Sequence, residues 1–225
     1  EKTQFDNNGK TLGSPWKFDQ YGESGLPISG LFPKVAKHAD KLCVIRSMTS
    51  AFSEHTSANY FLHSGLGQVG RPSMGAWVTY GLGSESEELP GFVVLNGGLT
   101  PPGGLDNFSS GFLPASYQAS LFAAGEFPVA NLRSRRLETN GGRKRDLLRQ
   151  LDRELSDRLG QPDPIEAAIK NSELAFRMQV AVPELTDLST ETAATLDMYG
   201  PDVHRKGSYA YNCLIARRLA ERGTR

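Results

Sequence analysis

The scarcity of strand-length apolar runs most constrains what this chain can fold into. Only two runs read as buried strands, at residues 42–46 and 91–95. Several segments with helical periodicity surround them, and two strands offer little surface for so many apolar helix faces. Either the fold is mostly α, or further strands lie outside the chain. The alternation of strand and helix favours the second interpretation, an α/β fold.

Helix signals are strong at several places. Ser73, Ser189 and Ser208 are predicted to cap helices. The string at residues 163–166, Asp-Pro-Ile-Glu, predicts another helix start, and we expect that helix to stop before Pro183. A leucine stripe at helical spacing precedes it, formed by Leu147, Leu148, Leu151, Leu155 and Leu159. The last third of the chain is therefore predicted to be helical.

The chain is interpreted as one incomplete domain over residues 1–225. Residues 1–95 are its strand and helix core part, although residues 1–29 are rich in Gly, Pro, Asn and Ser and read as loop. Residues 96–142 lack clear periodicity and are predicted to be a loop insertion, which at this length is usually functional or disordered. Their aromatic residues argue for order. Residues 143–225 form the helical part.

Composition excludes some classes of partner. The formal net charge is zero, which argues against nucleic acid, because a phosphate backbone demands a positive excess. No apolar run reaches the roughly 18 residues of a transmembrane helix. Cys43 and Cys213 read as buried small hydrophobes rather than a disulfide framework. The chain begins at Glu1 without a signal peptide, which indicates a processed or truncated sequence, and the oligomeric state stays open.

The segment at residues 54–65 is the richest in reactive side chains. It is predicted to be a helix that Gly65 ends. In an α/β protein, a helix amino end that follows a strand is where chemistry collects. His55 lies at that end, where the helix dipole disfavours a protonated imidazole, so a neutral His55 suits metal ligation or base work. Alternatively, it is a loop histidine bonded to backbone.

The neighbouring residues also allow two readings each. Thr56 and Ser57 are either nucleophiles or caps of the same helix. Arg46, at the end of the first predicted strand, either holds an oxyanion such as phosphate or sulfate or pairs with an acid such as Glu54. In the long loop, Asn107 either contacts a substrate or forms a turn. His63 reads as structural, because it is about 12 Å along the helix from His55.

Five short strings carry a known pattern. They are SPWKF at 14–18, QYGESG at 20–25, LCVIRSM at 42–48, RPSMG at 71–75 and ELAFRMQ at 173–179. Together they resemble the domain-of-unknown-function 1501 family of bacterial, largely planctomycete, proteins. That family looks like a branch of the alkaline phosphatase and sulfatase superfamily. The resemblance implies a partial alkaline-phosphatase-like sheet flanked by helices, with a long loop insertion and a helical second half.

The resemblance also implies a site. In the superfamily, the nucleophile stands at a helix amino end about ten residues before a closing Thr-Gly or similar pair. Counting back from Gly65 puts His55 at that position, with Ala58 and Asn59 where sulfatases have Ser and Arg. If functional, His55 ligates a metal, accepts a phosphoryl group or acts as a base for Thr56. The implied catalytic residues are His55, Thr56 and Arg46, and the implied substrate contacts are Asn59, His63 and Asn107.

The implied function is hydrolysis of sulfate or phosphate esters, on a small-molecule or glycan substrate, with a divalent metal such as zinc, calcium or magnesium. His55 is the one metal ligand assigned here, and most ligands are expected outside the chain, so we expect this chain alone to be inactive. The alternative is a non-catalytic binding or structural protein that keeps the scaffold, since the sulfatase nucleophile and arginine are missing. Family members usually carry a twin-arginine export signal, which implies a periplasmic or exported protein.

Overall fold

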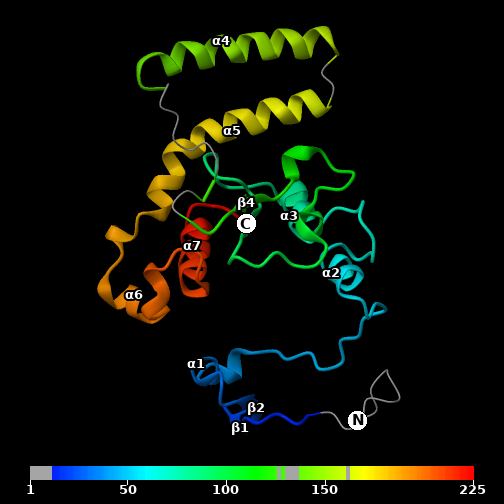
Figure 1. Ribbon diagram of the computed structural model, residues 1–225, viewed down its shortest axis with the longest axis vertical. Coiled ribbons are helices and arrows are strands. Elements are labelled where there is room, and N and C mark those ends of the chain that lie inside the picture. The colour runs from blue at the N-terminus through cyan, green and yellow to red at the C-terminus, as the bar shows by residue number, and fades with distance from the viewer. Residues whose placement is uncertain (1–11, 126–127, 130–136, 161–162) are drawn as a thin grey trace. The chain divides into compact units, whose positions relative to one another are not determined.

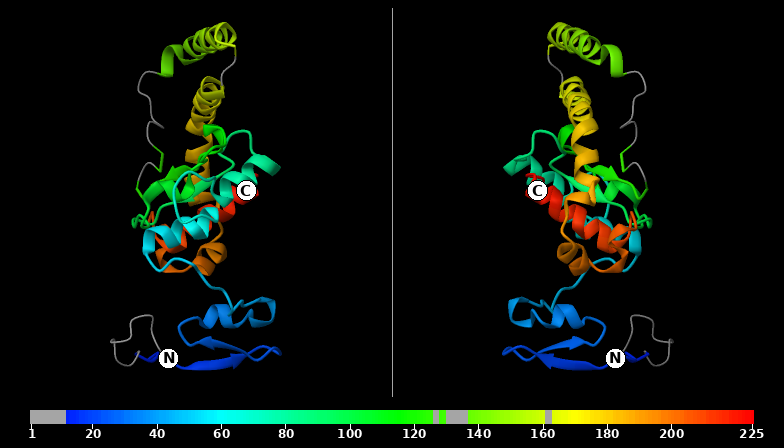
Figure 2. Two further views of the ribbon diagram at one scale, coloured as in Figure 1. Left: turned by 90° about the vertical axis from the view of Figure 1, so that its right-hand side faces the viewer. Right: turned by 90° about the vertical axis from the view of Figure 1, so that its left-hand side faces the viewer.

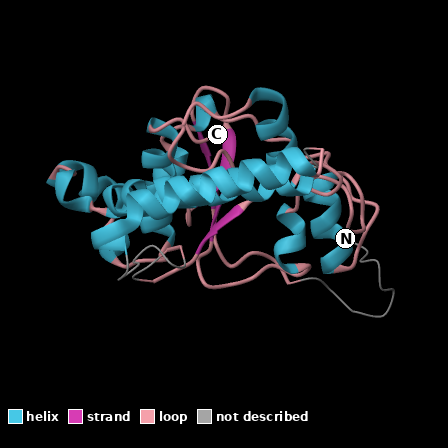
Figure 3. Ribbon diagram, turned by 90° about the horizontal axis from the view of Figure 1, so that it is seen from above, coloured by secondary structure: helices cyan, strands magenta, loops and turns pink. Residues whose placement is uncertain are grey.

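The computed structural model describes residues 12–125, 128–129, 137–160 and 163–225. The chain divides into two compact units, residues 1–49 and residues 50–225. Among the described residues, seven α-helices accompany four short strands, and Figure 3 shows how far helix and loop outweigh strand. The predicted mixed α/β class is confirmed.

A small hairpin is the main element of the first unit. Strand β1 (Phe18–Tyr21) pairs antiparallel with β2 (Leu26–Ser29). Helix α1 (Pro33–Ala36) lies beside the hairpin (Figure 2), and Ile28, Ala36 and Ala39 form a small core. The prediction of loop over residues 1–29 is therefore wrong for the hairpin. Two of the glycines that indicated a loop, Gly22 and Gly25, have positive φ and form the tight turn between the two strands.

The predicted strand at residues 42–46 is wrong. This segment is loop and turn, and Val44 and Ile45 are 53% and 65% exposed. A strand needs a neighbour to take its backbone hydrogen bonds, and no described residue pairs with this segment. Cys43 is correspondingly exposed rather than buried.

A parallel strand pair lies inside the second unit. Strand β3 (Val93–Leu95) confirms the predicted strand at 91–95, and it pairs with β4 (Ser120–Phe122). The second strand falls inside the predicted loop insertion, which also contains the 3-10 helices η2 (Gly104–Phe108) and η3 (Ala115–Tyr117). The aromatic content of this stretch correctly indicated order, but the prediction of a pure loop missed these elements because each is only three to five residues long.

Two helices of the second unit begin and end where their signals predicted. Helix α2 (His55–Ser64) ends at Gly65, whose φ of 73° is left-handed. Helix α3 (Met74–Leu82) starts after Ser73, whose hydroxyl accepts a hydrogen bond from the Ala76 amide. Ser208 likewise caps α7 (Tyr209–Glu221). Helix α6 (Ala193–Tyr199) is capped by Thr192 rather than Ser189, which lies in a 3-10 turn.

Helices α4 (Leu137–Arg158) and α5 (Asp163–Thr186) lie side by side as a hairpin (Figure 1). Polar groups join them, since Arg149 pairs with Glu173 at 3.1 Å and the Ser156 hydroxyl bonds to Glu166. The leucine stripe of α4 is turned outward, with leucines 147, 148, 151, 155 and 159 between 40% and 57% exposed. The hairpin thus buries a polar face of α4.

Helix α5 runs through Pro183 instead of stopping before it. Proline removes one intrahelical hydrogen bond, but Val182 and Leu185 on either side are fully buried and hold the backbone in place. They belong to the main core, in which this end of α5 packs with α7 and the strand pair. The core residues are Leu89, Phe122, Met178, Ala181, Val182, Leu185, Tyr211, Ile215 and Leu219. Within the described ranges, none of the helices has the length and apolar character needed to cross a bilayer.

Candidate functional site

The amino end of α2 is capped by a carboxylate. The two oxygens of Glu54 accept hydrogen bonds from the backbone amides of Thr56 and Ser57, each at 2.9 Å. These bonds hold the pKa of the Glu54 carboxyl below its usual value, and the charge of His55 acts in the same direction. Glu54 therefore performs the capping that we considered for the hydroxyls of Thr56 and Ser57. His55 is the first residue of the helix, and it is exposed.

One face of α2 holds a loop in place. Asn59 donates from Nδ2 to the Pro102 carbonyl at 3.2 Å, and the Tyr60 hydroxyl donates to the Gly103 carbonyl at 3.2 Å. Asn107 donates to the same Pro102 oxygen at 2.9 Å. The structure thus brings together Asn59 and Asn107, two predicted substrate contacts that are far apart in the sequence. It uses both of them to fix backbone.

Asn107 is almost completely buried, with 2% of its surface exposed. Its Nδ2 also donates to the Gly104 carbonyl at 2.9 Å, so both amide protons are engaged. Its Oδ1 is buried without a hydrogen-bond partner among the described residues. Its observed role is to close the turn of η2, and contact with a substrate stays a prediction.

His63 lies at the far end of α2. Its ring meets the ring of Phe108 edge-on, with centroids 4.9 Å apart. Burial lowers the pKa of His63, which favours the neutral imidazole. Phe108 also lines a hollow of about 220 Å³ at the carboxyl end of β3, whose other walls include Leu95, Leu99, Leu105 and Leu121. Phe108 is therefore a defined packing partner for His63, in agreement with the structural interpretation of this histidine.

Arg46 lies in a turn of the first unit and is exposed. Its partnership with His55 at an oxyanion stays a prediction. No group of three His, Cys, Asp or Glu side chains gathers into a metal site within the part of the chain that the structure describes. At the α2 terminus, the carboxylate nearest in sequence to His55 is that of Glu54, which is already engaged with backbone amides. The residues that the structure describes do not by themselves fit the metal that the resemblance implies.

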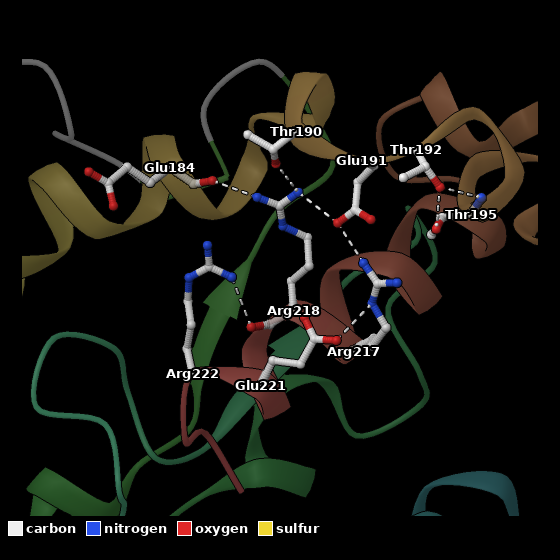
Figure 4. A network of polar contacts seen from close by, with 9 residues as sticks. All are labelled: Glu184, Thr190, Glu191, Thr192, Thr195, Arg217, Arg218, Glu221 and Arg222. Atoms are coloured by element: carbon white, nitrogen blue, oxygen red, sulfur yellow. Dashed lines mark hydrogen bonds and ion pairs between the residues drawn. The ribbon is translucent and has the colours of Figure 1, made fainter.

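Sequence reasoning missed a buried ionic cluster, shown in Figure 4. Arg217 and Arg218 from α7 both reach one oxygen of Glu191, which precedes α6. Arg218 also donates to the Glu184 carbonyl at 2.9 Å and is 4% exposed. The paired arginines at the end of an otherwise apolar helix are the only sequence signal, since their partner lies 26 and 27 positions away.

These features define a mixed α/β protein with a carboxylate-capped helix, a loop fixed by two asparagines and an apolar hollow beside that loop. The chain belongs to the family described as Protein of unknown function (DUF1501), whose match covers residues 1–225. Comparisons with curated proteins and with solved structures gave no match. The family resemblance carried by the five strings is thereby confirmed.

Proposed function

We propose that this protein is a sulfatase-like or phosphatase-like hydrolase of the alkaline phosphatase superfamily, acting on sulfate or phosphate esters of a small molecule or glycan. The observation that carries the proposal is the placement of His55 and Thr56, exposed and part-exposed, in the first turn of a capped helix. Helix amino ends favour anions. A group presented there is suitably placed to meet the anionic centre of an ester.

Three roles for His55 remain within this proposal. As an acceptor, its imidazole nitrogen takes the phosphoryl or sulfuryl group while the alcohol leaves, and water then displaces the group. As a base, it takes the proton of the Thr56 hydroxyl, which then attacks. As a ligand, it contributes to a divalent metal, zinc, calcium or magnesium, that other ligands must complete. No step here depends on that metal, because the described residues do not assemble its site.

The loop next to α2 supports the proposal by its rigidity. Asn59, Tyr60 and Asn107 fix the backbone at residues 102–104 through four hydrogen bonds. A fixed loop beside a reactive helix keeps reacting groups in register.

A second candidate function has its own observation. The carboxylate of Glu54 already occupies the two amides that an ester oxyanion would use. This favours a non-catalytic binding or structural protein that keeps the scaffold. We also propose, from the family resemblance, a planctomycete-type protein that is periplasmic or exported, which fractionation of cells that produce it would test.

Hydrolysis of 4-nitrophenyl sulfate and 4-nitrophenyl phosphate by the full-length protein tests the proposal, in buffer with zinc, calcium or magnesium. We expect His55→Ala to lower kcat/KM by about 100-fold or more. His204→Ala, which removes another exposed histidine of the same unit, should leave it unchanged. Equal loss in Thr56→Val assigns the nucleophile to Thr56, and an acid-labile covalent adduct assigns it to His55. No hydrolysis with any metal, or full activity in His55→Ala, contradicts the proposal and favours the binding protein.

A further inference from the structure

We propose that a second hollow, between the carboxyl end of β3 and helix α7, binds a neutral planar small molecule that carries a carboxamide or lactam edge. The hollow has a volume of about 380 Å³, which is within the range of small-ligand sites. It shares Leu95 and Gly97 with the hollow behind Phe108. The proposal concerns binding alone and is independent of ester hydrolysis.

One face of α7 forms a wall of this hollow. Tyr209, Asn212, Cys213 and Ala216 line it, and their spacing of three, four and seven residues puts them on one side of the helix. Tyr209 is 87% exposed, so its ring is available to stack on a planar ligand. The helix thus offers an aromatic ring, a carboxamide and a thiol side by side.

The lining determines the charge of the ligand. No Asp, Glu, Lys or Arg is among the described residues that line the hollow. An ionic ligand would lose hydration there without gaining a counter-charge, so the expected ligand is neutral. The side chain of Asn212 has no hydrogen bond within the described part of the chain, and it is half-buried. A carboxamide presents a donor and an acceptor together, and its complement is another amide or a lactam.

Gly97 leaves room within the hollow because it has no side chain. A Cβ at Gly97 would lie 3.5 Å from the Gly207 carbonyl oxygen and 3.7 Å from Nδ2 of Asn212. Both are ordinary contacts, so the backbone tolerates a side chain at Gly97, and this residue is not among the glycines at positive φ. A larger side chain would project into the space that the ligand needs. Gly97→Leu is therefore a blocking variant that avoids backbone strain.

Titration of the full-length protein with benzamide and benzoate, followed by two-dimensional amide NMR, tests the proposal. These probes have the same shape and differ in charge. We expect saturable shifts at Gly97, Gly207 and the Asn212 side chain with benzamide, and binding of benzoate at least tenfold weaker. Asn212→Leu, which keeps the branched shape but removes the amide, should weaken benzamide binding at least tenfold, and Gly97→Leu should abolish the shifts of Gly207.

Gly81→Leu is the matched control for the blocking variant. Gly81 has open space around it and no positive φ, so benzamide binding should be unchanged. The dispersion of the amide spectrum reports whether each variant folds. The proposal is overturned if neither probe binds, if both bind equally, or if Asn212→Leu binds benzamide as tightly as the wild type. Because the readout is binding, none of these results bears on hydrolysis at α2.

Discussion

Arg218 donates from Nη1 to Oε1 of Glu191 over 2.9 Å, although only 4% of the arginine side chain is exposed. The second Nη atom donates to the Glu184 carbonyl, so one guanidinium joins the end of α5, the turn before α6 and α7. Glu191 also accepts from Arg217, and this bond is the main reason that the pKa of Glu191 lies below its usual value. The ionic cluster therefore holds three helical segments together.

Replacing Arg218 should strongly destabilise the folded protein. In Arg218→Met, the largely buried carboxylate of Glu191 loses one of its two arginine partners. We expect a loss of about 3–5 kcal/mol in the free energy of unfolding. Arg205→Met is the control, because its pair with Asp202 is exposed and should contribute less than about 1 kcal/mol. Urea denaturation of both variants measures the difference. Equal losses would contradict a structural role for the buried pair.

Asn107 should be sensitive to the kind of substitution. Asn107→Ala removes a donor from the carbonyls of Pro102 and Gly104, of which Pro102 keeps its bond from Asn59, and should cost about 1–3 kcal/mol of stability. Asn107→Asp keeps the shape but sets a carboxylate against those carbonyl oxygens, so it should cost more than the alanine. Thermal unfolding of the two variants compares them. A milder effect of the aspartate would refute the donor role of Nδ2.

Substitutions at two glycines of the same loop region should distinguish the cost of backbone strain from the cost of a steric clash. Gly104 and Gly111 both have left-handed φ, at 62° and 55°. A Cβ at Gly104 meets open space, whereas at Gly111 it would lie 2.4 Å from the backbone nitrogen of Pro72. Gly104→Ala should therefore cost only the conformational term, about 1–2 kcal/mol. Gly111→Ala should cost clearly more in the same denaturation assay, and similar values would show that the approach to Pro72 is relaxed.

Stability should fall in mild acid because of His63. Burial lowers the pKa of His63 in the folded chain below its usual 6.5, so the unfolded chain binds more protons between the two values. The contribution is complete above pH 6.5 and is lost as pH falls from there through the folded pKa. Urea unfolding of the wild type and of His63→Phe across this range should show a smaller slope in the variant. His204→Phe should keep the wild-type slope.

Local signals predicted helix positions well. Ser73, Gly65 and Ser208 act through hydrogen bonds and φ angles within a few residues of themselves, so the sequence alone contains the information. Strands need distant partners, and this explains both errors about them. The run at 42–46 is apolar but unpaired, whereas β4 inside the predicted loop pairs with β3 more than twenty residues away.

In the candidate site, too, local features could be predicted from the sequence and contacts between distant residues could not. Placing His55 at the start of a helix required only the pattern around Glu54 and Gly65. That Asn59 and Asn107 share the Pro102 oxygen depends on how the loop folds back on α2, and neither residue carries a local sign of it. The pairing of Arg218 with Glu191 was missed for the same reason.

The outward leucines of α4 have a consequence for hydrogen exchange. Apolar burial gives most helices in proteins their stability, but this helix is held to α5 by the Arg149–Glu173 pair and the Ser156 hydroxyl. Its amides should therefore exchange with solvent by local opening, long before those of α7, whose Leu214 and Ile215 are buried in the core. A ligand or partner that covered the leucines would be visible as slowed exchange confined to this one helix.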